Sequence, residues 1–145
     1  MHINTLIIYP MLAMVALTFV IWLWMYYTRV MPVLKGELSI DDYGKADMKY
    51  PARLHYATDN FSNLFEMPSL FYLLCTLLLI TQSVTDGLLY MAWAYVGLRL
   101  LHSLIHCSVN NILYRFISYQ ISSWILWGMW LVFVWEWGLN RVLHI

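Results

Sequence analysis

A cation and two imidazole groups stand within an otherwise uncharged run, residues 87–111, which is long enough to cross a lipid bilayer. Arg99, His102 and His106 are spaced so that a helix places them on one face, which Tyr95 and Asn110 extend. An arginine exposed to lipid at mid-membrane costs on the order of 3 kcal/mol on insertion scales. Such groups therefore face protein, water or a ligand. This polar face is the best indication of a functional site in the sequence.

The histidines allow a metal site as one interpretation. His102 and His106 are four residues apart, a spacing that lets one helical turn bind a single metal ion or a haem. Glu66 or His55 from a neighbouring helix would then complete the site. The alternative is that both imidazoles are hydrogen-bonded within a packed bundle. A catalytic metal site needs at least a third ligand, which the sequence does not clearly supply.

A second polar face leads to Glu66, which directly precedes an apolar segment. His55, Asp59, Asn63 and Glu66 recur at helical spacing and therefore share one face. An ionisable group that enters the membrane pairs with another such group or marks a ligand site. We expect Glu66 to meet Arg99 of the following helix. Two interpretations remain open: the pair only locks the helices together, or it also forms the wall of a polar cavity that receives a ligand.

The composition is that of an integral membrane protein. Hydrophobic residues make up 62% of the chain, charged residues only 11%, and the mean hydropathy is +0.65. The formal net charge is zero, so nothing indicates a nucleic-acid partner. We predict an all-α, four-helix membrane bundle that forms one domain within the bilayer. The expected membrane spans are residues 5–28, 64–82, 88–107 and 117–139.

The longest connection sets the orientation of the bundle. Residues 29–62 hold five of the eight Lys and Arg residues, and the connection after the third span adds Arg115. Cytoplasmic loops carry the excess of positive charge, so this long loop is expected in the cytoplasm and both termini on the opposite side. Pro51 suits the first position of a helix that begins before the second span. Pro68 lacks a backbone donor and should bend that helix just inside the membrane.

Several of these residues together resemble the MAPEG family, the membrane-associated proteins of eicosanoid and glutathione metabolism. The resemblance extends over residues 22–119 and includes the four-span layout. It implies a four-helix bundle assembled as a homotrimer, with an active site between neighbouring subunits near the cytoplasmic face. Its enzymes use glutathione to attack or isomerise lipophilic electrophiles, or to reduce lipid hydroperoxides. The residues that carry the resemblance are Asn63, Glu66, Pro68, Arg99, His102, Arg115 and Tyr119.

The resemblance also implies roles for individual residues. Asn63 and Glu66 would hold the peptide and amino groups of glutathione, with Arg99 behind them, and Arg29 would bind a carboxylate. Arg115 matches the arginine that lowers the thiol pKa in catalytic members, since a guanidinium group favours a nearby thiolate, the reactive nucleophile. Tyr119, one turn further on, would face the same cleft. The implied glutathione-binding residues are Arg29, Asn63, Glu66, Arg99, His102 and His106, and the implied catalytic residues are Arg115 and Tyr119.

Three departures from the family pattern indicate a divergent, bacterial-type member. Asp59 stands where family enzymes usually carry an arginine, and it would repel the carboxylates of glutathione. His106 stands where the eicosanoid enzymes commonly have a tyrosine, and Pro68 follows the glutamate earlier than in those enzymes. The leading hypothesis, which follows from the resemblance as a whole, is a glutathione-dependent transferase or peroxidase acting on lipophilic substrates. The alternatives are a non-catalytic lipid-binding scaffold or accessory subunit of a membrane complex, and the metal or haem site at His102 and His106.

Overall fold

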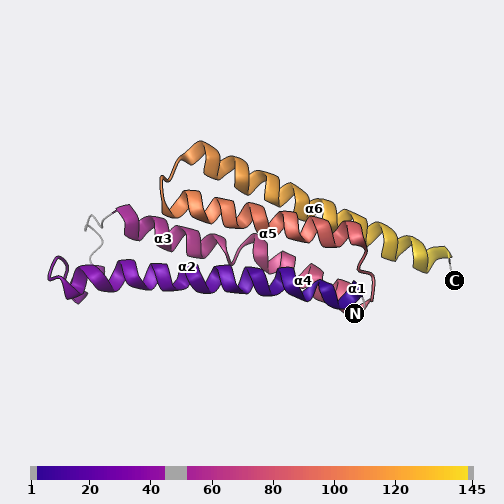
Figure 1. Cartoon of the computed structure of the whole chain (residues 1–145), viewed down its shortest axis with the longest axis horizontal. Coiled ribbons are helices and arrows are strands. Elements are labelled where there is room, and N and C mark those ends of the chain that lie inside the picture. Colours follow the sequence, from indigo (N-terminus) through magenta and orange to yellow (C-terminus); the bar gives the residue numbers. More distant parts are fainter. Residues whose placement is uncertain (1–2, 45–51, 144–145) are drawn as a thin grey trace.

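The computed structural model describes residues 3–44 and 52–143, and all regular structure within these ranges is helical. Figure 1 shows the helices running nearly along one long axis. The elements are α1 (Ile3–Leu6), α2 (Ile8–Leu34), the short 3-10 helix η1 (Ile40–Gly44), α3 (Ala52–Asn63), α4 (Met67–Ile80), α5 (Asp86–Cys107) and α6 (Ile112–Leu143).

Four stretches of the described chain are long and apolar enough to cross a membrane: Ile3–Leu34, Leu54–Ile80, Asp86–Cys107 and Ile112–Gly138. Large apolar side chains are exposed along them, as expected where lipid is the solvent. In Figure 1, α1, the C-terminal end of α6 and the α4–α5 turn lie at one end of the bundle, whereas the C-terminal end of α2, the start of α3 and the α5–α6 connection lie at the other.

Helix α2 extends further into the expected loop 29–62 than the charge pattern indicated, and the helix expected before the second span is present as α3. Helix α2 continues to Leu34 and ends where Gly36 adopts a left-handed backbone, with φ of +70°. Helix α3 occupies Ala52–Asn63, so the second long apolar stretch starts at Leu54 rather than at residue 64. Charged residues indicate where hydrocarbon ends, and a helix can continue beyond that boundary. Pro51, Lys45 and Lys49 lie outside the described residues.

The predicted bend near Pro68 is a complete break between two helices. Helix α3 ends at Asn63, and Pro68 lies in the first turn of α4, where its missing N–H leaves no intrahelical bond unmade. Glu66, the residue before α4, has φ of −81° and ψ of −97°, outside the helical region. The break turns the chain at residues 64–66, so that neighbouring side chains there face different parts of the bundle.

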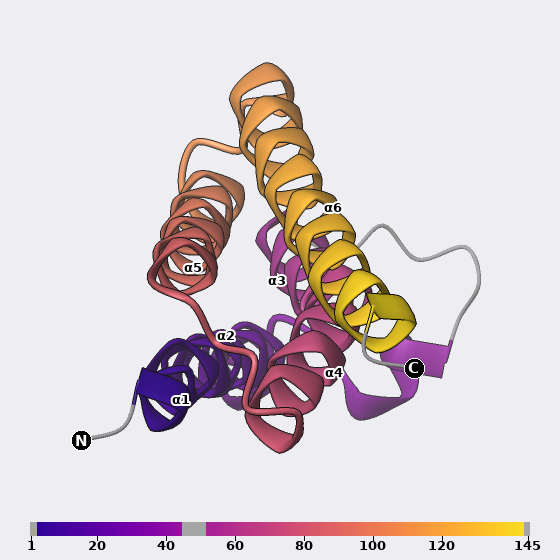
Figure 2. The same cartoon turned by 90° about the vertical axis from the view of Figure 1, so that its right-hand side faces the viewer.

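The core is built from all four long segments. Met14, Phe71, Ala92 and Leu126 are among its fully buried residues, one each from α2, α4, α5 and α6. Figure 2 shows the bundle turned by 90°, with α5 and α6 above α2 and α4. Gly128 of α6 lies against Met91 of α5: a Cβ atom there would lie 3.1 Å from Cε of Met91, the flexible end of that side chain.

Candidate functional site

The polar face of α5 is buried within the bundle, as its position in an apolar segment required. Tyr95, Arg99 and His106 have no exposed surface, and His102 is 3% exposed. The buried face of α5 packs mainly against α6 and also contacts α3. Polar side chains buried in this way are normally hydrogen-bonded, so each exception needs a physical explanation.

Arg99 is such an exception. Its Nε, Nη1 and Nη2 atoms are buried and have no hydrogen-bond partner among the described residues. Its Cζ atom lies 4.4 Å from the ring centroid of Tyr119 and 5.3 Å from that of Tyr95. Cation–π contacts of this kind contribute about 2 kcal/mol when desolvated, but they leave all five N–H donors without an acceptor. The guanidinium group therefore suits an acceptor-rich ligand.

The expected direct pair of Glu66 and Arg99 is wrong, because Tyr119 lies between them. The Tyr119 hydroxyl donates a hydrogen bond to Oε2 of Glu66 at 3.3 Å, while the face of its ring covers Arg99. Glu66 is exposed and Arg99 is fully buried. The reason is the break before α4, which places the Glu66 backbone outside the helix. The two ionic groups are thus linked through one phenol.

The two histidines both contact Arg115 of α6. His102 Nδ1 donates to the backbone carbonyl oxygen of Arg115 at 3.0 Å. Nη1 of Arg115 donates to Nε2 of His106 at 3.0 Å and to Oδ1 of Asn110 at 2.8 Å. Within residues 3–44 and 52–143, no third His, Cys, Asp or Glu joins His102 and His106 in a group that could bind a metal. The contacts of the pair are those of hydrogen-bonding groups.

A pocket of about 260 Å³ opens beside these residues. It brings together four residues that the sequence pointed to, from the end of α3, from α5 and from α6. Glu66 and Arg99 adjoin it through Tyr119. The lining residues are Asn63, His102, Ile112, Arg115, Phe116, Tyr119 and Gln120.

Arg29 is not part of this pocket in the single chain. Its Nη2 donates to Oγ1 of Thr58 at 3.3 Å, and its backbone carbonyl accepts a 2.6 Å bond from the Tyr43 hydroxyl. These bonds connect the C-terminal part of α2 to α3 and η1. Its role in binding a carboxylate stays a prediction.

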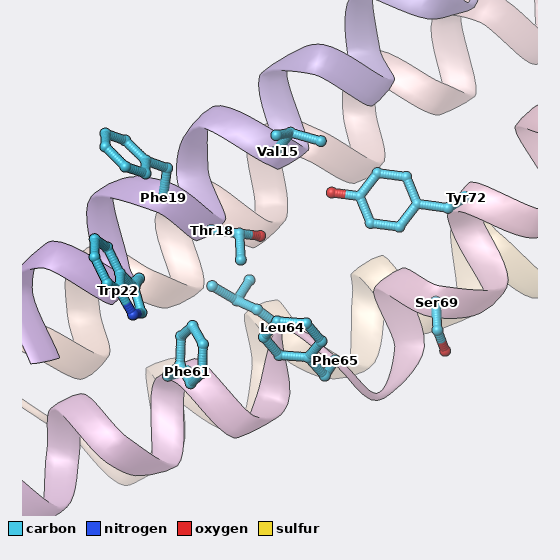
Figure 3. A pocket seen from close by; sticks show the side chains of 9 residues that line it. All are labelled: Val15, Thr18, Phe19, Trp22, Phe61, Leu64, Phe65, Ser69 and Tyr72. Atoms are coloured by element: carbon cyan, nitrogen blue, oxygen red, sulfur yellow. The ribbon is translucent and has the colours of Figure 1, made fainter.

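A larger, apolar groove lies between α2 and the α3–α4 break. It has a volume of about 580 Å³. Figure 3 shows aromatic side chains along both walls, with the Tyr72 hydroxyl directed toward α2. Leu64 and Phe65 line this groove, whereas the next residue, Glu66, binds Tyr119. The lining residues are Val15, Thr18, Phe19, Trp22, Phe61, Leu64, Phe65, Ser69 and Tyr72.

The sequence analysis missed the polar contact that joins α3 to α5. Asn60 is fully buried; its Nδ2 donates to Sγ of Cys107 at 3.3 Å, and its Oδ1 accepts from Oγ of Ser103 at 3.2 Å. A signal was present, since Asn60 falls on the same helical face as the buried Leu54, Ala57 and Leu64.

A bundle of four membrane-crossing helices with a buried cationic face beside a polar pocket defines a small multi-pass integral membrane protein. The family model described as MAPEG family matches residues 7–144, nearly the whole chain. The chain belongs to the MAPEG family, as the resemblance of its motifs indicated. No curated protein and no solved structure matches it.

Proposed function

We propose that this protein is a glutathione-dependent membrane transferase or peroxidase that acts on lipophilic electrophiles or lipid hydroperoxides. Membership of the MAPEG family supports a role in glutathione chemistry. The observation that carries the proposal is the fully buried, unpartnered guanidinium group of Arg99 beside a pocket lined by Asn63, His102, Arg115 and Tyr119.

Glutathione matches the chemistry of this pocket. It carries two carboxylates and two peptide groups, which supply the acceptors that Arg99 lacks. In the proposed arrangement, Asn63 and Glu66 hold its peptide and amino groups. Arg99 then binds a carboxylate once the ring of Tyr119 shifts from the guanidinium group. His102 contributes Nε2, which is buried and without a partner among the described residues.

Arg115 is the proposed catalytic residue. Three of its five N–H hydrogens, on Nη2 and Nε, are not used in hydrogen bonds to the described chain, and its side chain lines the pocket. A positive charge at this place favours the thiolate of glutathione. The thiolate sulfur then bonds to the electrophilic carbon of the substrate while the bond to the leaving group breaks. Tyr119, in the same pocket, can donate its phenolic proton to a developing anion.

Asp59 restricts how glutathione lies in the pocket. It is an exposed carboxylate on α3, one helical turn before Asn63. Like charges repel, so neither carboxylate of the tripeptide should lie beside it. The proposed assembly is a homotrimer with both termini on the non-cytoplasmic side, which places the pocket toward the cytoplasmic glutathione supply.

Conjugation of a generic aryl halide tests this function. The protein purified in detergent should form the thioether from glutathione and the halide. Arg115→Ala should lower kcat/KM by roughly 100-fold, the scale of one charged transition-state contact. Lys35→Ala, a change of an exposed cation beyond α2, is the matched control and should leave the rate unchanged. Absence of glutathione binding at millimolar concentration would contradict the proposal.

The apolar groove favours a second candidate function, that of a lipid-binding scaffold. The groove is larger than the polar pocket and lies within membrane-crossing segments. A scaffold would bind a lipophilic ligand without glutathione and without turnover. Two results together would support this function. The protein would bind a fluorescent fatty acid but not glutathione, and Phe65→Ser would weaken the binding of the fatty acid.

A further inference from the structure

The two histidines of α5 share one partner, Arg115. We propose that His106 and Asn110 are positioning residues that hold the Arg115 guanidinium group against the pocket, while His102 fixes the backbone of the same residue. This inference rests on the proposed function, because that function gives Arg115 its catalytic role. According to this inference, His102 and His106 are four residues apart because both of them bind Arg115 of the next helix and so orient it.

The side chain of Arg115 is held through a single nitrogen. Both hydrogens of Nη1 are used, one by Nε2 of His106 and one by Oδ1 of Asn110. Because the guanidinium group is planar, two acceptors at one nitrogen fix the direction of the remaining N–H bonds. His106 is fully buried and does not line the pocket. It therefore acts on the pocket through Arg115.

The hydrogen bonds also define which nitrogen of each ring carries the proton. A carbonyl oxygen only accepts, so Nδ1 of His102 is the protonated nitrogen of that ring. A guanidinium group only donates, so Nε2 of His106 is unprotonated and acts as the acceptor. The two rings thus bind Arg115 through opposite nitrogens and opposite roles.

Asn110, which accepts a hydrogen bond from Nη1 of Arg115, has an unusual backbone conformation. Its φ of +46° lies in the left-handed region, which asparagine tolerates better than most residues. Its backbone N–H donates to the carbonyl of Ile105 at 2.8 Å and so closes the end of α5. This backbone places the amide oxygen within reach of Arg115. Residues held in such conformations concentrate at functional sites.

The opposite nitrogens allow a test with paired amide substitutions. The glutamine amide reaches the position of Nε2, and the asparagine amide reaches that of Nδ1. His106→Gln should therefore keep most of kcat/KM, whereas His106→Asn should lose roughly 10- to 100-fold. At residue 102 the order reverses for the melting temperature: His102→Asn keeps the bond to the Arg115 carbonyl and His102→Gln loses it, while the asparagine also lacks the Nε2 proposed to contact glutathione. A role of His106 in packing alone gives no reason for a difference in kcat/KM between His106→Gln and His106→Asn.

A double-mutant cycle shows whether His106 acts through Arg115. In the Arg115→Ala background, which retains measurable conjugation from binding alone, His106→Asn should have no further effect on kcat/KM. The ultraviolet absorbance of bound glutathione thiolate should fall in His106→Asn and recover in His106→Gln. Additive losses, or equal losses in the two variants at residue 106, would overturn the inference while leaving the proposed function intact.

Substitutions of Asn110 test the inference at a residue that lies between α5 and α6, outside both helices. Asn110→Gly keeps the left-handed backbone and removes the amide, and Asn110→Asp keeps an acceptor for Nη1. Asn110→Gly should lower kcat/KM and the thiolate signal, and Asn110→Asp should also lower the thiolate signal, because its carboxylate offsets the positive charge of Arg115. Equal activity of Asn110→Gly and the unaltered protein would overturn the role of this residue. An unaltered protein that neither binds nor conjugates glutathione would instead overturn the proposed function, and the inference would fall with it.

Discussion

The ring of Tyr119 covers the guanidinium group of Arg99, with 4.4 Å between the ring centroid and Cζ. The same phenol donates to Glu66, so one side chain of α6 contacts both ionic groups that the sequence predicted to meet directly. This ring covers the face of the Arg99 guanidinium group on which an anionic ligand would bind. Ligand binding at Arg99 therefore requires the ring to move.

Substitutions of Tyr119 separate the two contacts. Tyr119→Phe removes the hydroxyl bond to Glu66 but keeps the ring over Arg99, so the thermal stability in detergent should change little. Tyr119→Leu removes the cation–π contact and should lower the free energy of unfolding by about 1–2 kcal/mol. Denaturation followed by circular dichroism measures both. Equal destabilisation by Phe and Leu would show that the ring contributes nothing over Arg99.

We expect Arg99 to contribute to the binding of an anionic ligand and to lower the melting temperature of the protein measured without glutathione. A buried cation without hydrogen bonds is destabilising, and an apolar side chain of similar length often replaces it favourably. We expect Arg99→Met to raise the melting temperature while it abolishes glutathione binding measured by calorimetry. A lower melting temperature together with unchanged glutathione affinity would contradict this account of Arg99.

The Asn60 contact should matter for stability. Asn60→Leu leaves the Ser103 hydroxyl without its partner in the interface of α3 and α5, which costs about 1–3 kcal/mol in the free energy of unfolding. Ser62→Ala, an exposed change on the same helix, is the control and should fall within about 0.5 kcal/mol of the unaltered protein. A similar small effect for both variants would show that the buried bonds are energetically neutral.

Gly128 lies at the contact of α5 and α6, where an added side chain would meet Met91. A Cβ atom at this position would lie 3.1 Å from Cε of Met91, so a leucine requires Met91 to move, whereas Gly97 on α5 has nothing within 4 Å of an added Cβ. Gly128→Leu should destabilise the bundle by about 1–3 kcal/mol, and Gly97→Leu should not. Unfolding curves of the two variants provide the comparison. If Gly128→Leu were as stable as Gly97→Leu, the packing at this crossing would be wrong.

The proposed orientation can be tested by labelling one introduced cysteine at a time in closed, right-side-out vesicles, in a variant with Cys75 and Cys107 replaced by alanine. Ser39→Cys lies at the end of the bundle that carries the α2–α3 connection, and Asp86→Cys lies at the other. Both residues are exposed. An impermeant thiol reagent should modify residue 86 in intact vesicles and residue 39 only after lysis. The reverse pattern would invert the bundle in the membrane.

The sequence predicted the class of fold because its apolar segments are long and its charges are concentrated. The buried face of Arg99, His102 and His106 followed from the same physics, since lipid does not accept such groups. The start of α3 followed from Pro51, but the end of α2 did not, because hydropathy marks the hydrocarbon boundary rather than the last helical residue. The hydrogen-bond partners of Glu66 and of the two histidines could not be predicted. They depend on the break at Glu66 and on which face of α6 turns toward α5, and residue spacing within one helix determines neither.

The formation of bound thiolate tests the central claim most directly. Glutathione added to the detergent-purified protein should produce the ultraviolet difference absorbance of a thiolate near neutral pH, and Arg115→Ala should remove it. The analogue in which serine replaces the cysteine of glutathione should compete for the site and give no absorbance. If glutathione produces no thiolate signal and is not displaced by the analogue, the pocket of Asn63, His102, Arg115 and Tyr119 is not a glutathione site.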